Sequence, residues 1–483
     1  MTKKIAATLV LLILLSALSG AAGAAGTPQG ARSTSAKIDP QLSGRLDALP
    51  GGADVSVILS LPAQADLSHL ESVPLASRAS RLQNVVRTLQ AQAEKDQRPL
   101  IEHLEKLRER GLVKEVQPLW IANAVAVTAS PEIIHSLAAR PDVALITENT
   151  PIVLAPSVDA EAAAPTANIA STGAPQLWAL GFRGQGIVVA NLDSGVDIAK
   201  NPDLAAKWRG GTNSWFDPTN DPPTTKPYDN NGHGTATMSL MVGETVGMAP
   251  GATWIAAKVF PDFGDGSISD AIASFGWLLN PDGNAATDDA PHVVNNSWTL
   301  IPTGSTGCFI HPSLQTSLKN LLAAGILPVF SAGNYRGKYD PSDTSPGNYP
   351  EALAVGSIYG SDGLSDFSSV GPSACRPAGM YFPDLVGYGD PVLAYNIYGG
   401  LSGFTGTSFS APQVAGGLAL LLSAYPLLTP EQQRQALIYG AVDLGTPGPD
   451  NTFGYGRFNI LNSYHWVKAE IYKWSLFIPV AGR

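Results

Sequence analysis

Hydrophobic and polar positions change their spacing once along the chain, at about residue 150. Over residues 40–150, short apolar or alternating runs are separated by two stretches with helical spacing. The expected elements there are a strand at 55–61, a helix at 78–109, strands at 113–120 and 122–129, a helix at 130–140 and a strand at 143–149. This β-α-β-β-α-β order is typical of a small ferredoxin-like α+β domain. Pro99 falls inside the first helix, and we expect it to kink or restart that helix because it lacks an N–H group.

From about residue 175, nearly continuous apolar runs alternate with helical stretches. The expected strands lie at 187–192, 253–260, 292–297, 326–332 and 352–357, and the expected helices at 234–242, 267–280, 313–324, 411–424 and 430–441. Strands that are apolar throughout are typical of a parallel sheet covered by helices on both faces. The pattern predicts a doubly wound α/β domain of about 300 residues. Its active site would lie at the carboxyl ends of strands.

A linker joins the two units, and a tail follows the second. Residues 155–170 contain proline and small residues and few large apolar side chains, so we expect an exposed, cleavable connection. The tail at 466–483 ends in WSLFIPVAGR, whose apolar run is far too short to span a membrane. An added edge strand is the simplest interpretation of the tail, and a short sorting or anchoring signal is the alternative.

The first residues have the layout of a secretory signal peptide. Lys3 and Lys4 precede an apolar run at 5–18, and an Ala22-Gly23-Ala24 cleavage pattern follows. No later stretch is a candidate for a transmembrane segment. We therefore expect a signal peptide at 1–24 and a secreted, extracellular protein, with association to the cell surface left open.

Composition narrows the choice of partners. The chain has 483 residues and a formal net charge of −10. Binding to nucleic-acid phosphates needs clustered Lys and Arg, so this acidic balance argues against nucleic acid as a partner.

The two cysteines, Cys308 and Cys375, lie in loop-like stretches that contain Pro and Gly. In an exported protein a disulfide between them is the favoured interpretation, and two free buried thiols are the alternative.

Three polar residues lie at the edges of elements in the α/β domain, in the order Asp…His…Ser. Asp193 ends a strand in IVVANLDSGVD, His233 stands between glycines in NNGHGTATM, and Ser408 precedes small residues in GTSFSAPQVAG. Each has an ordinary alternative: a turn aspartate, a histidine in a glycine-rich turn, and the N-cap of a helix. As a set they supply what a serine nucleophile needs, namely a base and a carboxylate that orients the base.

A nucleophilic serine also needs donors for the oxyanion. FSAGN at 330–334 leaves a predicted strand and ends in Asn334, whose amide is a candidate donor; a turn asparagine is the alternative.

An esterase and a catalytically silent binding module are the rival functions. No G-x-S-x-G elbow surrounds Ser408, and the chain order Ser…Asp…His expected of that esterase class is absent. A carboxyl-type serine protease would carry an acidic group in place of His233.

These motifs resemble those of the subtilisin family of serine proteases. LDSGVD, GHGT and GTSFSAP are similar to the family's Asp, His and Ser motifs, and SAGN is similar to the stretch that bears its oxyanion asparagine. FPDLVGYG (382–389) resembles the segment before the Ser motif, and GYGRFNI (454–460) resembles the closing strand. The resemblance covers roughly residues 175–465, and VNNSW and PGNYPEALAVGS look closest to the bacillopeptidase F-like branch. The N-terminal unit similarly resembles the family's inhibitory propeptide, of the inhibitor I9 type.

The resemblance implies roles for individual residues. Ser408 would attack the scissile carbonyl, His233 would carry the proton to the leaving amine, and Asp193 would orient His233. Asn334 and the Ser408 N–H would hold the oxyanion. The implied substrate-binding residues are Ser297, Trp298, Thr299, Ser331, Ala332 and Gly333.

The resemblance also implies an organisation into domains. The expected parts are a propeptide domain at 40–150, a linker with the processing site at 151–172, a subtilisin-like peptidase domain at 173–465 and the tail. The protein would be a self-processing zymogen whose own propeptide assists folding and then inhibits. Its substrates would be proteins or peptides, and no cofactor would be required for the chemistry.

The chain departs from the family pattern at the substrate-binding strand and in the Ser motif. Two glycines that usually follow Ser-x are replaced here by Thr299 and Leu300, so we expect a P1 preference shifted toward smaller side chains. Gln413 stands where the family usually has histidine, and Phe409 where it usually has methionine. We expect these two changes to affect packing only.

Calcium is the metal that the resemblance raises, as a structural ion. Asp203 matches an acidic residue that ligates calcium in some relatives, but the loop that completes that site is missing. The acidic loop at 213–229 offers the carboxylates of Asp217, Asp221 and Asp229. A solvated surface loop is the favoured interpretation, and the identity of any metal site stays unknown from the sequence.

Overall fold

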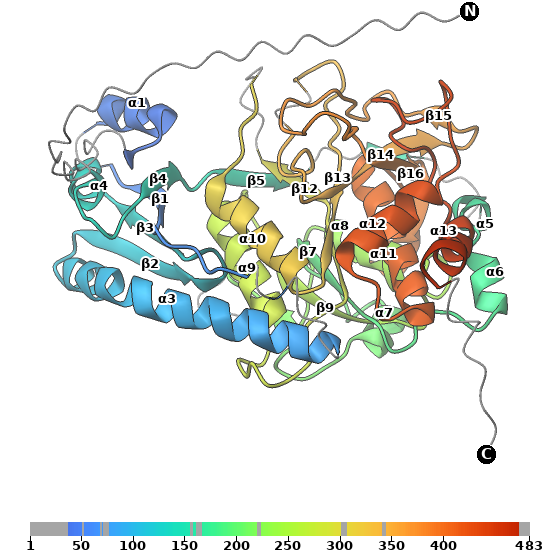
Figure 1. The fold of residues 1–483 in the computed structure, drawn as a ribbon, viewed down its shortest axis with the longest axis horizontal. Coiled ribbons are helices and arrows are strands. Elements are labelled where there is room, and N and C mark those ends of the chain that lie inside the picture. The colour runs from blue at the N-terminus through green and yellow to red at the C-terminus, as the bar shows by residue number, and fades with distance from the viewer. Residues whose placement is uncertain are drawn as a thin grey trace, which may run out of the picture.

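The computed structural model describes residues 37–50, 53–67, 70, 77–154, 158–160, 167–219, 224–300, 307–340 and 344–472. The predicted signal peptide and the apolar run of the tail lie outside these residues. The described chain forms two units with separate main sheets, which pack side by side (Figure 1).

The N-terminal unit is an antiparallel sheet with the strand order β2-β3-β1-β4. Its strands are β1 (Val55–Ser60), β2 (Val113–Leu119), β3 (Ala124–Ala129) and β4 (Leu145–Glu148). Its helices are α1 (Pro40–Ala48), α3 (Arg78–Glu109) and α4 (Pro131–Ala138), with the short η2 (Trp120–Ala122) between β2 and β3. The predicted ferredoxin-like arrangement is therefore present, with α1 added before the first strand.

Pro99 does not restart the helix, because α3 is a single helix of 32 residues; the alternative, a kink at Pro99, stays a prediction. Proline removes one backbone hydrogen bond. The buried stripe nevertheless continues on both sides of it, with Leu89 and Ala93 before and Leu100 and Leu104 after. Burial of this stripe against the sheet offsets the missing bond, since tertiary packing supplies most helical stability in proteins.

The larger unit is built on an eight-stranded, mostly parallel sheet, which confirms the predicted α/β fold. The strand order is β15-β14-β13-β11-β7-β9-β8, with β16 paired to β14, and β15 runs antiparallel. The strands are β7 (Val188–Asp193), β8 (Trp215–Phe216), β9 (Thr253–Lys258), β11 (Val293–Asn296), β13 (Leu327–Ser331), β14 (Leu353–Tyr359), β15 (Gly363–Leu364) and β16 (Leu385–Asp390).

Helices cover both faces of this sheet because successive side chains of each strand point to opposite faces. Ala190 and Leu192 of β7 pack with α9 (Ile268–Leu279) and α10 (Pro312–Ala323). Val189, which precedes Ala190 and points to the other side, packs with the helices of the opposite face. The helices on that face are α8 (His233–Val242), α11 (Thr407–Ala424) and α12 (Pro430–Tyr439); α5 (Ala167–Thr172), α6 (Ala174–Ala179), α7 (Pro202–Lys207) and α13 (Ile460–Trp466) complete the unit.

Two small sheets lie beside the main one, with the orders β10-β5-β12 and β17-β18-β6. Their strands are β5 (Pro151–Leu154), β6 (Val158–Ala160), β10 (Gly266–Ser267), β12 (Trp298–Leu300), β17 (Val392–Tyr395) and β18 (Leu401–Thr405). Parts of the predicted linker are thus strands rather than irregular chain. They gain their hydrogen bonds from strands more than a hundred residues away, which a local pattern cannot show.

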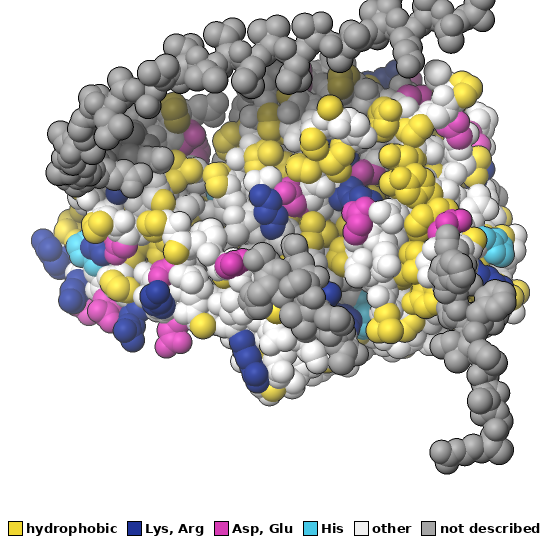
Figure 2. All heavy atoms as spheres, in the orientation of Figure 1, with side chains coloured by type: hydrophobic (Ala, Val, Ile, Leu, Met, Phe, Trp, Pro, Cys, Tyr) yellow, Lys and Arg dark blue, Asp and Glu magenta, His cyan; other side chains and the backbone are white. Residues whose placement is uncertain are grey.

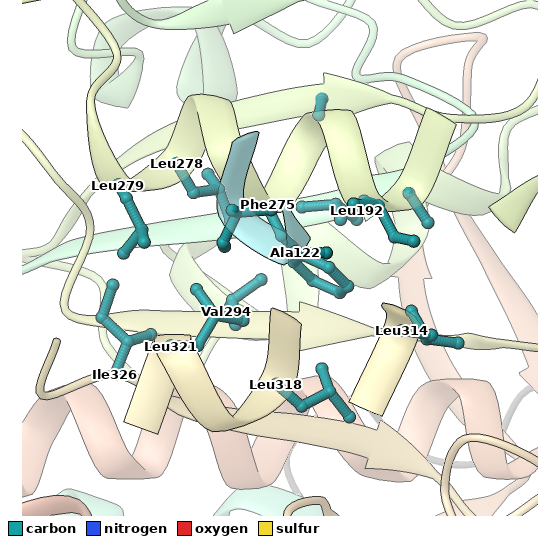
Figure 3. Packing of buried hydrophobic residues seen from close by; sticks show 14 of the residues in the cluster. Ala122, Leu192, Phe275, Leu278, Leu279, Val294, Leu314, Leu318, Leu321 and Ile326 are labelled. Carbon is teal, nitrogen blue, oxygen red and sulfur yellow. The ribbon is translucent and has the colours of Figure 1, made fainter. Parts of the chain in front are cut away.

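One hydrophobic cluster joins the two units. Figure 3 shows Ala122 of η2 close to Phe275, between α9 and α10. Trp120 approaches so closely that a Cβ on Gly276 would lie 3.1 Å from its Nε1. Figure 2 shows Lys and Arg side chains gathered over the N-terminal unit, at the left, so apolar contacts at the interface contrast with a charged outer surface.

The C-terminal part differs from prediction in one place. Residues 467–471 form a π-helical turn, and the apolar run for which an edge strand was expected lies outside the described residues. The predicted closing strand in GYGRFNI is reduced to isolated bridges of Arg457 with Val386 and Val442, after which α13 begins. The glycines and apolar residues of GYGRFNI are typical of a strand. Its neighbours Val386 and Val442 each pair with a single residue, Arg457, so no regular strand forms.

Candidate active site

Asp193 ends β7 at the carboxyl edge of the main sheet and is 1% exposed. Its Oδ1 lies 2.8 Å from Nδ1 of His233 and accepts the N–H of Ser194 at 2.7 Å. Its Oδ2 accepts the hydroxyl of Thr237 at 3.2 Å. An ionised carboxylate can only accept. The neutral imidazole therefore carries its proton on Nδ1, and its Nε2 is left as an acceptor.

His233 is the first residue of α8 and follows Gly232, whose φ is 97°. A Cβ on Gly234 would lie 2.1 Å from the carbonyl oxygen of Gly195, so α8 reaches the turn after Asp193 only because residue 234 has no side chain. His233 Nε2 is buried and has no hydrogen-bond partner within the described part of the chain. A buried acceptor of this kind is suited to take up a proton.

Ser408 is fully buried and is the second residue of α11. Its Oγ donates to the carbonyl of Ser297 at 3.4 Å, and its own carbonyl accepts the Ser297 hydroxyl at 2.8 Å. The ring of the next residue, Phe409, lies 5.3 Å from the imidazole of His233. The start of α11 and the start of α8 therefore meet, and the structure brings all three members of the predicted triad to one place.

Helix α11 begins at Thr407 rather than at the predicted residue 411, so Ser408 is inside the first turn and is not the N-cap. Pro412 consequently lies in the helix interior rather than in its first turn. The physical reason is a long-range cap: Asn334 Oδ1 accepts the N–H of Thr407 at 2.9 Å. The N–H of Ser408 is one of the first-turn amides that have no partner within a helix.

The same contact fixes the orientation of the Asn334 amide. Its Oδ1 also accepts the hydroxyl of Thr407 at 2.8 Å. Because the oxygen is held by Thr407, the Nδ2 group is the end that faces Gly406, where a Cβ would come within 3.0 Å of Nδ2. A side-chain donor and the amides at the start of α11 thus lie beside Ser408, as oxyanion stabilisation requires.

The predicted substrate-binding residues fall into two groups. Ser297 leads into β12, whose Trp298 and Thr299 pair with Leu154 and Val153 of β5. The second group is Ser331 at the end of β13, followed by Ala332 and Gly333.

The two groups differ in what their side chains contact. Trp298 is fully buried, with its ring 5.3 Å from that of Phe330 and 6.5 Å from that of Phe275. Its side chain therefore belongs to the core, and only its backbone faces β5. The hydroxyl of Ser331 is buried and has no hydrogen-bond partner among the residues that the structure describes. The N–H of Gly333 donates to the hydroxyl of Thr407 at 3.2 Å.

The chain itself flanks the site on two sides. β5 pairs antiparallel with β10 and β12, and β12 directly follows Ser297. β6 pairs antiparallel with β18, the strand that leads through Gly406 into α11. β5 and β6 therefore each add a strand to a segment next to the site: β12, which follows Ser297, and β18, which precedes α11.

Asp203 has the surroundings of an ion pair rather than of a calcium ligand. Its carboxylate pairs with Lys207 Nζ at 2.8 Å and accepts the Tyr395 hydroxyl and the Glu244 N–H at 2.8 Å each. Lys207 Nζ also donates to the carbonyl of Val242 at 2.8 Å. An ammonium group therefore occupies the centre of these oxygens.

The acidic loop is likewise internally bonded. Asp217 accepts the hydroxyls of Thr219 at 2.9 Å and Thr224 at 2.5 Å, Asp221 lies outside the described residues, and Asp229 bonds the turn before α8. Within the described chain there is no cluster of three or more His, Cys, Asp or Glu side chains suited to a metal ion.

Two further contacts bear on the site region. Cys308 and Cys375 form a disulfide with Cα atoms 4.8 Å apart. Gln413 does more than pack: its Nε2 donates to the carbonyl of Phe409 at 2.7 Å, and its Oε1 accepts from Asn168 of α5 at 3.0 Å. No helix among the described residues is long and apolar enough to cross a membrane.

Sequence reasoning missed the roles of Thr407 and Ser194, and it considered Asp229 only as a calcium ligand. All three stand within four residues of a triad member along the chain. That adjacency is the available signal, but it does not reveal which of the neighbours turn inward.

The sequence of the chain is similar to those of known proteases. The model of the subtilase family, Peptidase_S8, matches residues 184–456, a range that contains Asp193, His233, Asn334 and Ser408. Bacillopeptidase F of Bacillus subtilis (strain 168) is 30% identical over 438 residues, which span 82% of this chain and 30% of that protein. Subtilisin NAT of Bacillus subtilis subsp. natto is 31% identical over 343 residues, which span 69% of this chain and 78% of that protein. The chain belongs to the subtilase family of serine endopeptidases.

Proposed function

We propose that this chain is a secreted endopeptidase that is made as a zymogen and cuts itself. Proteins and peptides are its substrates, and its own chain is the first of them. The observation that carries the proposal is the pair of strands β5 and β6, which hold the chain on both sides of Ser408. A protein substrate bound by strand addition would lie in the same way.

The proposed mechanism assigns one step to each group. Ser408 Oγ attacks the scissile carbonyl while its proton moves to Nε2 of His233. Asp193 holds the opposite ring nitrogen at 2.8 Å and stabilises the imidazolium. Nδ2 of Asn334 and the N–H of Ser408 donate to the oxyanion. His233 then gives its proton to the leaving amine, and water attacks the acyl-enzyme in the mirror sequence of steps.

The first cut falls between Leu154 and Val158 in this proposal. Leu154 is the last residue of β5 and stands opposite Trp298, and Val158 is the first residue of β6 and stands opposite Thr405. The peptide bonds between Leu154 and Val158 connect β5 to β6. This range narrows the processing site expected in the linker at 151–172.

The N-terminal unit acts as the inhibitor. Its polar contacts to the peptidase unit include Thr147 with His311 at 2.8 Å and Asn320 with the Ile121 carbonyl at 2.6 Å. The apolar contacts of η2 with α9 and α10 join them (Figure 3). After the cut, β5 would still pair with β12 and keep substrates off that strand.

Secretion follows from the signal-peptide pattern and is supported by the disulfide, since disulfides persist outside the reducing cytosol. No cofactor is needed for the proposed steps. The carboxylate of Asp203 is paired with Lys207 at 2.8 Å, which supports a site without calcium there. We propose a P1 preference for small side chains, which a library of peptides varied at P1 would refute if large aromatic residues were cleaved best.

Intact mass tests the proposal. The wild type, S408A and S410A are expressed in parallel without the signal peptide; S410A is a matched control because Ser410 is also a buried serine of α11. Wild type and S410A should lose the N-terminal unit, with a new N-terminus between residues 155 and 158, while S408A stays whole. If all three stay whole, a fluorophosphonate label decides between processing by another protease and a silent site. Cleavage of casein rather than short esters separates the endopeptidase from an esterase.

A further inference from the structure

Outside the triad, one buried carboxylate organises the turn that carries the candidate base. Asp229 is 5% exposed. Its Oδ1 accepts the N–H groups of Asn231 at 3.0 Å and Gly232 at 2.9 Å. Its Oδ2 accepts the N–H of Thr235 at 2.9 Å and the hydroxyl of the same residue at 2.7 Å. The start of α8 is thus bound to a single side chain.

The same carboxylate is also tied to the turn after β7. The Ser194 hydroxyl donates to Asp229 Oδ1 at 3.0 Å and accepts the N–H of Gly234 at 2.9 Å. The N–H of Ser194 donates to Asp193, and its carbonyl accepts Lys258 Nζ at 2.8 Å. All three polar groups of Ser194 are therefore bound. Asp229 and Ser194 together fix the Asp193 turn and the His233 turn to each other.

The charge of Asp229 addresses a second requirement. His233 is the first residue of α8, where the helix dipole presents about half a positive charge and disfavours an imidazolium. A carboxylate on the first-turn amides counteracts that field. The other charged groups nearby are Lys258, which is paired with Asp262 at 3.0 Å, and Asp197, whose N–H donates to the hydroxyl of Thr235.

We propose that Asp229 is a positioning residue for catalysis, which holds His233 against Asp193 and favours the imidazolium that forms when Ser408 gives up its proton. The inference rests on the proposed function. It goes beyond a cap of α8, because a cap alone would contribute to stability but would not alter the protonation of His233. The two roles therefore differ in their pH signature.

Self-cleavage of the full chain provides the assay, because the chain is its own substrate in the proposed function and no separate substrate has to bind. Unfolded wild type, D229N, D229S and the control D282N are diluted into buffers from pH 5 to 9, and cleavage is followed by intact mass. Asp282 is a matched control, since its carboxylate accepts the Asn284 N–H and the Thr287 hydroxyl in a loop. The rate of fluorophosphonate labelling of Ser408 gives a second readout without a peptide.

We expect the plateau rate of D229N and D229S to fall about tenfold. Their acid limb should move to lower pH, because the imidazolium has lost a stabilising charge. D282N should match the wild type in both respects. An unmoved acid limb in folded D229N or D229S would reduce Asp229 to a structural cap and overturn the proposal.

S194A keeps the inference testable if neither Asp229 variant folds. This change removes the link between the two turns and leaves the carboxylate in place. Its cleavage rate should fall on the order of tenfold, as small misplacements of a base do, with the acid limb unmoved. Wild-type rate in S194A would overturn the positioning role. Absence of cleavage and labelling in the wild type itself would instead refute the proposed function.

Discussion

A buried histidine at the contact between the two units should make their association depend on pH. His311 Nδ1 accepts the N–H of Leu314 at 3.4 Å, so Nε2 carries the proton and donates to the Thr147 hydroxyl at 2.8 Å. Burial lowers the pKa of His311 from 6.5 to about 4. The Tyr349 hydroxyl accepts the backbone N–H of His311 at 2.8 Å and stays neutral, because burial raises the pKa of Tyr349. Departure of the N-terminal unit removes Thr147, the hydrogen-bond partner of the imidazole.

The sign and the size of the effect follow from linkage. A histidine whose pKa is lower in the complex binds fewer protons there, so the association is strongest above pH 6.5 and weakens as the pH falls toward 4. If His311 regains its ordinary pKa in the free peptidase unit, the difference between 6.5 and about 4 corresponds to at most ~3.4 kcal/mol of association free energy. Between pH 7 and pH 5 the dissociation constant should rise by up to about 20-fold. His292 adds to this trend, since burial and then the Arg78 charge of the N-terminal unit lower its pKa to about 3.

Processed wild-type protein, inactivated at Ser408 with a fluorophosphonate, is suited to the measurement because the bound N-terminal unit cannot be degraded. Its dissociation constant is measured from pH 4.5 to 8 by calorimetry or size-exclusion chromatography. H311N is the comparison, since asparagine also caps helices but does not titrate. Its pH dependence should be clearly weaker than that of the wild type. Equal dissociation constants at pH 7 and pH 5, or an identical pH dependence in H311N, would refute the reasoning.

Four further changes have expected outcomes. N334A should lower kcat by about 10²–10³, the loss known for such a donor in a subtilisin, with little change in KM, and peptide kinetics check it. K207M should destabilise the peptidase unit by about 1–3 kcal/mol, because it leaves buried oxygens unsatisfied; thermal unfolding with and without calcium measures this, and a wild-type Tm would contradict it. G276A should weaken binding of the N-terminal unit about tenfold, since its Cβ would crowd Trp120 at 3.1 Å, while leaving peptide cleavage unchanged. C375S should destabilise by up to about 4 kcal/mol, because the disulfide closes a loop over a separation of 67 residues; denaturant unfolding of oxidised wild type against the variant decides.

The fold could be predicted where local pattern and burial agree. The strands β7, β9, β11 and β13 are largely buried on both faces, and their predicted positions match to within about two residues. The triad could be located because glycines flank its members where two backbone segments lie close together. At Gly234, an added Cβ would lie only 2.1 Å from the carbonyl oxygen of Gly195. These features are local consequences of a sheet covered on both sides, so the sequence displays them.

The misses share another physical origin, because each depends on a partner far along the chain. The start of α11 is set by Asn334, which lies 73 residues before Thr407. β5 exists because β12 supplies its hydrogen bonds. Helical periodicity and turn signals describe neighbours along the chain, so they cannot reveal these partners.

Thr299 and Leu300, which stand where the subtilisin family usually has two glycines in the strand proposed to bind substrate, show how such long-range contacts refine a prediction. Thr299 and Leu300 do not prevent strand addition, because β12 still pairs with β5 across both residues. The Thr299 hydroxyl donates to the carbonyl of Leu300 at 2.6 Å, and the N–H of Leu300 donates to Ser345 at 2.8 Å. The backbone of a substrate therefore retains its pairing surface. Any change in preference must arise from the side chains beside that surface, which is why kcat/KM across a P1 series, rather than overall activity, is the quantity that these residues should alter.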